Sequence, residues 1–254
     1  MRRIGIIVRI GVTALLLLLM AAVSDVFAQF GKEGDVQEEI LKREMPERVA
    51  EMKIDEVVKL LELKPGEIVA DIGAGTGVFA RPFAKAVGAK GTVYAVEIEQ
   101  PLLDAINERA KKEGISNVKT VLGEFNDPKL PVKDVDVAFF NRVLHEIERR
   151  AAYLDTVAKY LKPGGRIVII DKPTADDWMW MKRDTVDLWM ASIGFYAVDD
   201  FSIYKDKYFV VYQRPYAPSK LLDKTIATAS TKARPAKPAT ADKVTTAAKP
   251  STKQ

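Results

Sequence analysis

The sequence predicts an α/β fold: a seven-stranded, mostly parallel sheet that ends in an antiparallel hairpin, with helices on both faces. Two observations predict it. After Pro65-Gly66, short β-branched runs alternate with helical stretches, which is typical of parallel strands joined by crossover helices. The last two predicted strands are separated only by residues 204–207, and parallel strands cannot be joined by so short a connection.

The elements follow in order along the chain. Residues 33–63 are rich in helix-forming residues, so we expect one or two amphipathic helices interrupted near Pro46. Strands are expected at 67–72, 92–97, 118–122, 134–140, 166–171, 196–203 and 207–213. Helices are expected at 77–88, 100–113, 146–161 and 175–193.

The two ends of the chain differ from the body at 29–216. Residues 1–28 place Arg2, Arg3 and Arg9 before an apolar run at 10–23, with small residues just before Gln29. This pattern predicts a cleaved export signal, because the run is short of the roughly 20 residues that span a bilayer. An uncleaved membrane anchor is the alternative. Either way, we expect an exported, periplasmic or envelope-associated protein.

The C-terminal residues 217–254 contain no aromatic residue and are dominated by Ala, Thr, Lys and Pro, which predicts a disordered tail. Of the net charge of +4, residues 215–254 carry +6 and residues 1–28 carry +2, so the folded body is acidic. The acidic body argues against a nucleic-acid partner. The basic tail allows weak contact with an anionic envelope or membrane surface.

The absence of Cys and the single His exclude Cys-ligated metal sites and Cys nucleophiles, and no metal site is expected. The most informative segment is a glycine loop. Asp71 ends a predicted strand, and Gly73, Gly75 and Gly77 follow before a helix. Such a loop lets a ligand lie against bare backbone.

The residues around this loop distinguish two ligand classes. A dinucleotide site requires Gly-x-Gly-x-x-Gly, whereas Val78 occupies the position of its last glycine. The Asp71 carboxylate would oppose a pyrophosphate but suits an ammonium group. The loop therefore favours a nucleoside with a cationic amino-acid tail.

The segment Asp-Ile-Gly-Ala-Gly-Thr-Gly at 71–77 resembles the first motif of class I S-adenosylmethionine-dependent methyltransferases. Segments resembling the later motifs follow in the same order, at 93–97, 123–125, 136–141 and 161–171. The resemblance covers about residues 53–214 and implies a Rossmann-like fold with S-adenosyl-L-methionine as cofactor. It also implies roles for Glu97 at the ribose hydroxyls, for the Glu124 side chain and Phe125 N–H at adenine, and for Asn141 at the end of the fourth strand.

His145 is the candidate catalytic residue. It lies just beyond the carboxyl end of the fourth strand, where open α/β sheets place their ligands, and its ordinary pKa suits proton transfer near neutrality. Packing or capping of the next helix is the alternative role. Glu146 and Arg142 are further candidates for substrate contact.

All three Trp residues lie between the fifth and sixth strands, at 178, 180 and 189, with Met179, Met181 and Met190 among them. They predict either an apolar lid over a hydrophobic or aromatic acceptor, or a helix packed on the sheet.

The predicted function is methyl transfer to a small-molecule acceptor through an oxygen, carbon or sulfur nucleophile. The lack of an Asn-Pro-Pro-Tyr or Asp-Pro-Pro-Tyr segment argues against amino methylation of DNA bases, and the lack of Cys argues against cytosine-C5 and arsenic methylation. Two alternatives stay open: an aminopropyl transferase that resembles polyamine synthases, and a non-catalytic nucleoside-binding envelope protein.

An export signal conflicts with the use of a cofactor that is made in the cytoplasm. Three explanations would each resolve this conflict: an anchor that leaves the domain inside the cell, an unseen route of cofactor supply, or the loss of catalysis.

Overall fold

The computed structural model describes residue 38 and residues 40–173 and 181–215 of the 254-residue chain. The predicted export signal, Trp178, Met179 and Trp180, and the predicted tail lie outside the described residues. In the part of the chain that the structure describes, no helix has both the length and the apolar character needed to cross a bilayer.

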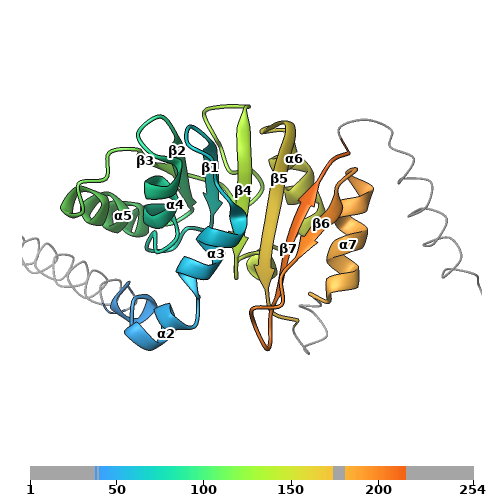
Figure 1. The fold of residues 1–254 in the computed structure, drawn as a ribbon, viewed down its shortest axis with the longest axis horizontal. Coiled ribbons are helices and arrows are strands. Elements are labelled where there is room, and N and C mark those ends of the chain that lie inside the picture. Colours follow the sequence, from blue (N-terminus) through green and yellow to red (C-terminus); the bar gives the residue numbers. More distant parts are fainter. Residues whose placement is uncertain (1–37, 39, 174–180, 216–254) are drawn as a thin grey trace, which may run out of the picture. The chain divides into compact units, whose positions relative to one another are not determined.

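Seven strands form one sheet in the order β3-β2-β1-β4-β5-β7-β6 (Figure 1). Strand β7 runs antiparallel to both β5 and β6, and the other pairs are parallel. The predicted fold class is therefore confirmed, including the terminal hairpin. The strands are β1 (Ile68–Ile72), β2 (Thr92–Glu97), β3 (Val118–Leu122), β4 (Val135–Asn141), β5 (Leu161–Asp171), β6 (Tyr196–Asp200) and β7 (Tyr208–Gln213).

The strand order reverses between β1 and β4. The chain runs outward from β1 through β2 to β3 and then returns to the other side of β1 with β4. The connections that leave β1 and β4 therefore go in opposite directions, which opens a crevice at the carboxyl ends of these strands. The glycine loop follows β1, and Asn141 ends β4, so both predicted features lie at this crevice.

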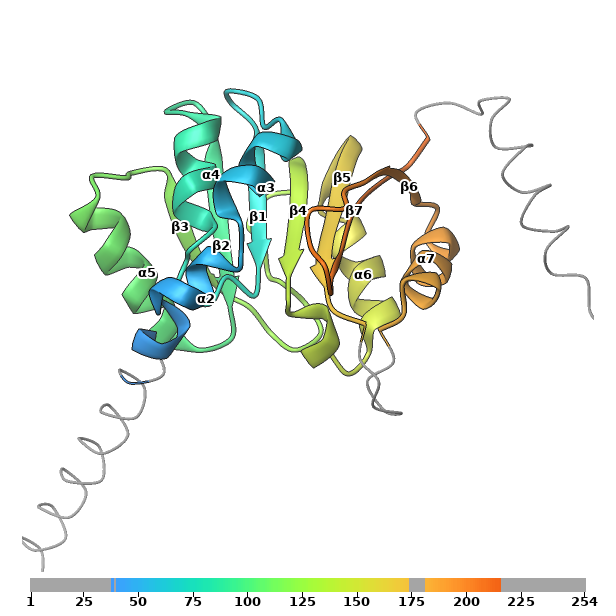
Figure 2. The ribbon, with the colours of Figure 1, turned by 60° about the horizontal axis from the view of Figure 1, so that its bottom comes forward.

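Helices cover the two faces of the sheet, because alternate strand residues point to opposite faces. Buried side chains of the first group of helices pack with Val69, Val93 and Val137, whereas those of the second group pack with Ala70 and Ala138. The groups can be followed in Figures 1 and 2. The first group is α3 (Ile54–Leu61), α4 (Ala80–Val87) and α5 (Gln100–Lys112), and the second is α6 (Arg150–Ala158) and α7 (Arg183–Ser192).

Element boundaries differ from the prediction where the backbone turns. Helix α4 begins at Ala80 instead of residue 77, because Gly77 still has a positive φ angle and the turn of the glycine loop extends to Phe79. A 3₁₀ turn at Leu144–Glu146 precedes α6, so the helix expected from 146 begins at Arg150. Strand β5 begins at Leu161, and its pairing with β4 is irregular between Leu161 and Arg166.

The described residues before β1 form short helices with the predicted interruption near Pro46, and a second interruption at 51–53, which was not predicted, separates α2 from α3. Helix α2 (Pro46–Ala50) starts with the proline at its first position, where a missing N–H costs little. The Ile40 side chain is buried against Leu102 and Ala105 of α5, and the Tyr204 hydroxyl donates a hydrogen bond to the Met52 carbonyl at 2.6 Å. Residues 40–53, called the N-terminal arm below, are thus attached to both halves of the sheet.

Candidate functional site

The glycine loop connects β1 to α4 through three residues with positive φ angles: 67° at Gly73, 58° at Gly75 and 77° at Gly77. A Cβ on Gly73 would lie 2.3 Å from Val143 Cγ2, and one on Gly77 would lie 3.0 Å from Ile106 Cγ1. Two of the glycines therefore make room for the protein's own side chains. A Cβ on Gly75 would have Arg43 Nη1 as its nearest contact, at 3.7 Å, so this residue presents bare backbone to the crevice.

A cavity of about 290 Å³ lies against this loop and the strand ends. The predicted site residues that line it are Asp71, Gly73, Gly75, Glu97, Asn141 and His145, together with Arg142 and Glu146. Gly77, Glu124 and Phe125 do not line it. The structure thus brings together residues from β1, β2 and β4 that are far apart in the sequence.

Asp71 is the most deeply buried acid of this cavity, with 2% of its surface exposed. Its Oδ2 atom is buried and has no hydrogen-bond partner among the described residues. Burial, with a contribution from the charge of Glu97, raises the pKa of Asp71 to about 8, and a hydrogen bond from the Ala80 N–H opposes the rise. A cationic group at Oδ2 would supply the missing partner and lower this pKa, so the site fits the ammonium group predicted from the sequence.

Glu97 ends β2 and is held by two backbone donors. The Gly75 N–H donates to Oε1 at 3.0 Å, and the Ile98 N–H donates to Oε2 at 2.9 Å. Burial raises the pKa of Glu97, while these hydrogen bonds and the charge of Arg43 oppose the rise. Each carboxylate oxygen can accept a further hydrogen bond, so the side chain is oriented for a pair of hydroxyl groups.

Glu124 and Phe125 follow β3, whose Leu122 lies opposite Glu97 in the sheet. The Glu124 N–H donates to the Asp127 carbonyl at 2.8 Å in a tight turn, and its side chain pairs with Lys129 at 3.2 Å. The Phe125 side chain is 84% exposed. Both residues lie at the same edge of the sheet as Glu97 but outside the cavity, and their contact with adenine stays a prediction.

The remaining predicted residues lie on the opposite side of the crevice. Asn141 ends β4, and His145 lies in the 3₁₀ turn that follows. The ring Nδ1 of His145 is 2.9 Å from Oδ1 of Asp171, the last residue of β5. A hydrogen bond with Asp171 raises the pKa of His145, and burial opposes the rise. Sequence reasoning did not identify Asp171 as a site residue, because its only signal is its place at a strand end.

The N-terminal arm also contributes to the cavity, which the sequence did not predict. Arg43, Arg48 and Met52 line it, although they belong to no motif and precede the first strand. Among the described side chains, the buried Nε atom of Arg48 has no hydrogen-bond partner. The arm therefore contributes two cationic residues to the cavity lining, and the charge of Arg43 acts on Glu97.

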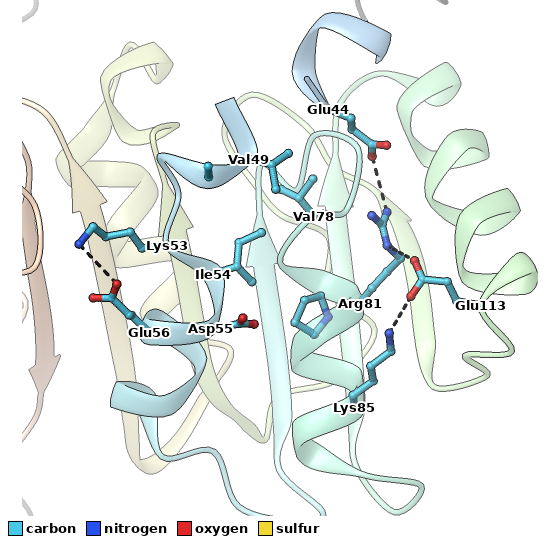
Figure 3. A pocket seen from close by; sticks show the side chains of 12 residues that line it. Glu44, Val49, Lys53, Ile54, Asp55, Glu56, Val78, Arg81, Lys85 and Glu113 are labelled. Carbon is cyan, nitrogen blue, oxygen red and sulfur yellow. Dashed lines mark hydrogen bonds and ion pairs between the residues drawn. The ribbon is translucent and has the colours of Figure 1, made fainter. Parts of the chain in front are cut away.

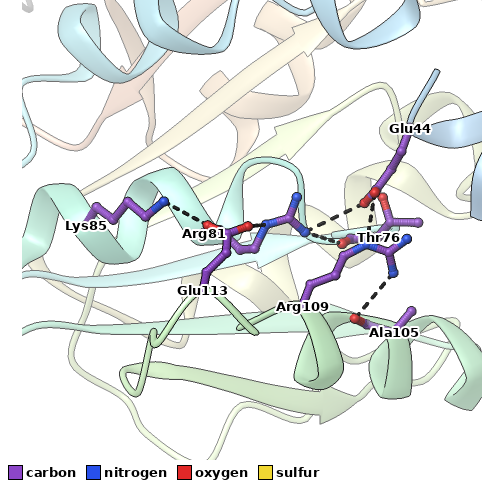
Figure 4. A network of polar contacts seen from close by, with 7 residues as sticks. All are labelled: Glu44, Thr76, Arg81, Lys85, Ala105, Arg109 and Glu113. Atoms are coloured by element: carbon purple, nitrogen blue, oxygen red, sulfur yellow. Dashed lines mark hydrogen bonds and ion pairs between the residues drawn. The ribbon is translucent and has the colours of Figure 1, made fainter. Parts of the chain in front are cut away.

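A network of ion pairs fixes the arm and the glycine loop to each other (Figure 4). Glu44 of the arm pairs with Arg109 of α5 at 2.9 Å and with Arg81 of α4 at 3.7 Å. Arg81 also donates to the Thr76 carbonyl in the glycine loop at 3.1 Å and pairs with Glu113 at 2.8 Å. One carboxylate on the arm thus connects to both helices next to the loop.

A second, broader cavity of about 640 Å³ lies between the arm and α4 (Figure 3). Its charged lining residues largely pair with one another, as in the Lys53–Glu56 pair at 3.4 Å and the Lys85–Glu113 pair at 2.8 Å. None of the predicted site residues lines it. The smaller cavity has the convergent strand ends and the Asp71 carboxylate, which forms no ion pair with the described residues, whereas the buried Glu44 Oε1 of the larger cavity faces Arg81 at 3.7 Å. The smaller cavity is therefore the better candidate site.

The described part of the Trp/Met stretch packs on the sheet. Met181 and Met190 are buried in the core cluster that contains α6 and α7, and Trp189 packs against the same cluster. Trp189 and Met190 of α7 fit the prediction of a helix packed on the sheet, whereas Met181 is buried just before this helix begins at Arg183. Within the described ranges, no group of three His, Asp or Glu side chains is arranged to hold a metal ion.

Comparisons with known proteins agree with this geometry. Residues 63–207 match a protein family described as "Methyltransferase domain". Nocamycin O-methyltransferase of Saccharothrix syringae is 29% identical over 125 residues, which are 48% of this chain and 45% of the relative. An arsenite methyltransferase of Halobacterium salinarum is 31% identical over 151 residues, which are 57% of this chain and 37% of the relative. The chain thus spans less than half the length of these curated relatives.

Among solved structures, a SAM-dependent methyltransferase from Aquifex aeolicus superimposes with a TM-score of 0.64 and 27% sequence identity. The match covers 70% of this chain and 98% of that one. The chain therefore belongs to the methyltransferase-domain family, that is, to the class I S-adenosylmethionine-dependent methyltransferases that its motifs resemble.

Proposed function

We propose that this protein transfers a methyl group from S-adenosylmethionine to a small-molecule acceptor. The observation that carries the proposal is the buried, unpartnered Oδ2 of Asp71 beside Glu97 and the glycine loop. S-adenosylmethionine has an ammonium group and two ribose hydroxyls. When bound, it supplies a methyl group that is activated by its sulfonium. Its ammonium and hydroxyl groups match the two carboxylates by charge and by hydrogen-bonding capacity.

The residues of the chain would divide the binding between them. Asp71 would hold the ammonium group, and Glu97 would accept hydrogen bonds from the ribose hydroxyls. Glu124 and the Phe125 N–H would hold adenine at the neighbouring strand end. Gly75 would give the ligand access to the backbone, and the N-terminal arm would exclude water, which strengthens the electrostatic interactions inside the cavity.

The acceptor is proposed to be a small molecule, hydrophobic or aromatic in part. The absence of Cys argues against the thiolate chemistry by which arsenic and cytosine C5 are methylated, even though one relative is an arsenite methyltransferase. The acidic body of the chain argues against a nucleic-acid acceptor. Oxygen, carbon and sulfur nucleophiles fit these limits.

The proposed location is exported, periplasmic or envelope-associated, and it rests on residues 1–28 alone. Cell fractionation of the tagged chain, followed by sequencing of its N-terminus, tests this location. A chain that starts at Gln29 outside the cytoplasm supports it. A cytoplasmic chain that keeps Met1 would contradict it and would remove the conflict with cofactor supply.

The function is tested by incubating the full chain with trideuteromethyl-labelled S-adenosylmethionine and pools of small hydroxyl, thiol and amine compounds. We expect S-adenosylhomocysteine to form together with one labelled product, and Asp71→Asn to abolish both. Cofactor binding without turnover of any pool would favour a non-catalytic binding protein. Turnover only with decarboxylated cofactor and an amine would favour an aminopropyl transferase.

A further inference from the structure

The carboxylate of Asp171 holds both the ring and the backbone of His145. Asp171 is the last residue of β5 and only 1% exposed. Its Oδ1 lies 2.9 Å from His145 Nδ1, and its Oδ2 lies 3.4 Å from the His145 backbone nitrogen. Because the carboxylate contacts two parts of the same residue, it fixes the ring relative to the strand end instead of merely touching it.

Other groups hold this pair in place. The Arg150 side chain donates to the His145 carbonyl at 2.7 Å and to the Leu144 carbonyl at 3.1 Å. The Lys172 N–H donates to Asp171 Oδ1 at 2.8 Å. The turn that carries the imidazole and the carboxylate that faces it are therefore both anchored, which is the arrangement required of a group that must keep one orientation.

The contact also selects one tautomer of His145. An ionised carboxylate only accepts hydrogen bonds, so Nδ1 must carry a proton in this contact. In the neutral ring, Nε2 then keeps a free electron pair. The His145 side chain lines the cavity, and its Nε2 is 3.7 Å from Glu146 Oε1, beyond hydrogen-bonding distance. This nitrogen is thus available to accept a proton at the cavity wall.

The charged groups around the ring act in different directions. Asp171 and Glu146 raise the pKa of His145, and burial and the charge of Arg142 lower it. Tyr208 of β7 lies opposite Asp171 in the sheet, and the charge of that carboxylate adds to burial in raising the pKa of the tyrosine. Tyr208 therefore stays neutral near pH 7 and does not compete with His145 as a base.

We propose that His145 is the general base of the reaction, that Asp171 is its positioning residue, and that the acceptor carries a weakly acidic hydroxyl, as a phenol or an enol does. This inference rests on the proposed methyl transfer and specifies its substrate class. A hydroxyl with a pKa of about 10 keeps its proton near neutrality and needs a base, whereas a thiol with a pKa of about 8.5 ionises far more readily.

The electron balance explains why a buried carboxylate faces the ring. Nε2 of His145 accepts the hydroxyl proton while the acceptor oxygen, or the carbon conjugated with it, forms a bond to the methyl carbon. The bond between the methyl carbon and the sulfur of S-adenosylmethionine breaks, and its electron pair remains on sulfur. The positive charge therefore moves from sulfur to the imidazole, where Asp171 stabilises it, as a carboxylate does for the histidine of a catalytic triad.

The first test reads the imidazole directly, because His145 is the only histidine of the chain. Nitrogen-15 NMR of the full chain across pH should show the Nδ1-protonated tautomer and a pKa above the ordinary value. Asp171→Asn should lower this pKa, and Glu146→Gln, which removes a more exposed charge, should change it less. A His145 pKa that is the same in Asp171→Asn and wild type would overturn the role of Asp171. Tm and far-UV circular dichroism show whether each variant is folded. If Asp171→Asn does not fold, Asp171→Glu takes its place, and its carboxylate should keep part of the rise in the pKa of His145.

The second test compares hydroxyl and thiol acceptors that share a carbon skeleton, with phenol and thiophenol as the first pair. We expect turnover of hydroxyl compounds to rise with pH through the pKa of His145. His145→Gln should lower their kcat by about 100-fold or more, and Asp171→Asn by about 10-fold with KM little changed. Asp171→Asn should also move the inflection of the pH profile to lower pH, which a loss of folded enzyme alone would not do.

Three outcomes would overturn the assignment: unchanged hydroxyl turnover in His145→Gln, turnover confined to thiols or amines, or a chain that binds the cofactor but methylates no hydroxyl compound. Calorimetric titration of S-adenosylmethionine into the same samples separates these failures from a failure of the proposed function. If wild type does not bind the cofactor, the proposed function fails, while the NMR titration still reports on the His145–Asp171 contact.

Discussion

At the scale of single residues, the site brings two carboxylates close enough for the charge of Glu97 to raise the pKa of Asp71. A buried acid whose pKa is raised in the folded state makes the protein less stable as pH increases. The folded state binds more protons than the unfolded one between the two pKa values. The contribution of Asp71 to the free energy of unfolding is therefore most favourable below the ordinary pKa of 3.8. It is lost as pH rises toward the folded-state pKa of about 8. A group that binds a cation thus costs stability when no cation is bound.

Asp71→Asn should therefore separate stability from function. The neutral isostere removes the cost of ionisation, so we expect the Tm of the ligand-free variant to exceed that of wild type at pH 8–9, and the difference to shrink toward pH 5. The same change should weaken cofactor binding by about 100-fold or more, because a buried cation loses its counter-charge. Thermal unfolding across pH and calorimetric titration measure the two effects. A Tm difference that does not vary with pH would contradict the assigned pKa.

Gly73 offers a second test at this scale, with a matched control. Gly73→Ala would place a Cβ 2.3 Å from Val143 Cγ2, whereas Gly114, with the same φ of 67°, has open space at that position. Gly114→Ala should cost about 1 kcal/mol of unfolding free energy from the left-handed backbone alone. Gly73→Ala should cost about 1–3 kcal/mol more from the clash and should weaken cofactor binding. Equal losses in chemical denaturation would show that the close approach of Val143 is unimportant.

At the scale of elements, ion pairs attach the N-terminal arm to the helices beside the glycine loop, and Glu44 is central to them. Its side chain is 22% exposed and pairs with Arg81 and Arg109 on two helices. Glu44→Gln should loosen the arm and weaken cofactor binding by about 3- to 10-fold. Glu38→Gln removes the exposed ion pair between Glu38, which precedes the arm, and Lys42 of the arm, and it should leave the affinity unchanged. Equal affinities of the two variants would argue that the arm plays no part in binding.

The strands were predictable from the sequence to within a few residues, because a buried parallel strand is a short β-branched run and its limits are set locally. Helix starts were less predictable. The start of α4 depends on how far the glycine loop extends, and the start of α6 depends on the 3₁₀ turn that carries His145. These boundaries depend on packing and on long-range contacts such as the one between His145 and Asp171. A local sequence pattern does not contain such contacts.

The candidate site likewise combines residues that a local pattern predicts with residues that only tertiary contacts bring to it. The places of Asp71, Gly73, Gly75 and Glu97 beside the cavity could be predicted, because each residue has a fixed position relative to a strand end. Arg43 and Arg48 could not, because the arm reaches the cavity through contacts with residues more than thirty positions away, as between Glu44 and Arg109. Asp171 could be placed at a strand end, but its partner was visible only once β4 and β5 were side by side.

At the scale of the whole molecule, the uneven charge of the chain predicts that folding and surface binding are separable. Residues 215–254 carry +6, whereas the described residues that line the cavity lie between Arg43 and Glu146. Deletion of residues 217–254 should leave Tm and cofactor affinity unchanged and should abolish binding to phosphatidylglycerol-containing vesicles at low salt. Co-sedimentation with the vesicles measures this binding. Equal binding of the full and shortened chains would assign any surface contact to the body of the protein.

In the proposed function, the cavity beside the glycine loop binds S-adenosylmethionine through Asp71 and Glu97. The most direct test is calorimetric titration of S-adenosylmethionine, and then S-adenosylhomocysteine, into the folded wild-type chain, Asp71→Asn and Glu97→Gln, in buffers of different ionisation enthalpy. We expect dissociation constants on the order of micromolar, with affinity strongly reduced in both variants. Near pH 7, wild type should release close to one proton on binding, because a cation lowers the pKa of Asp71 from about 8. A folded wild-type chain that binds neither ligand would contradict the account.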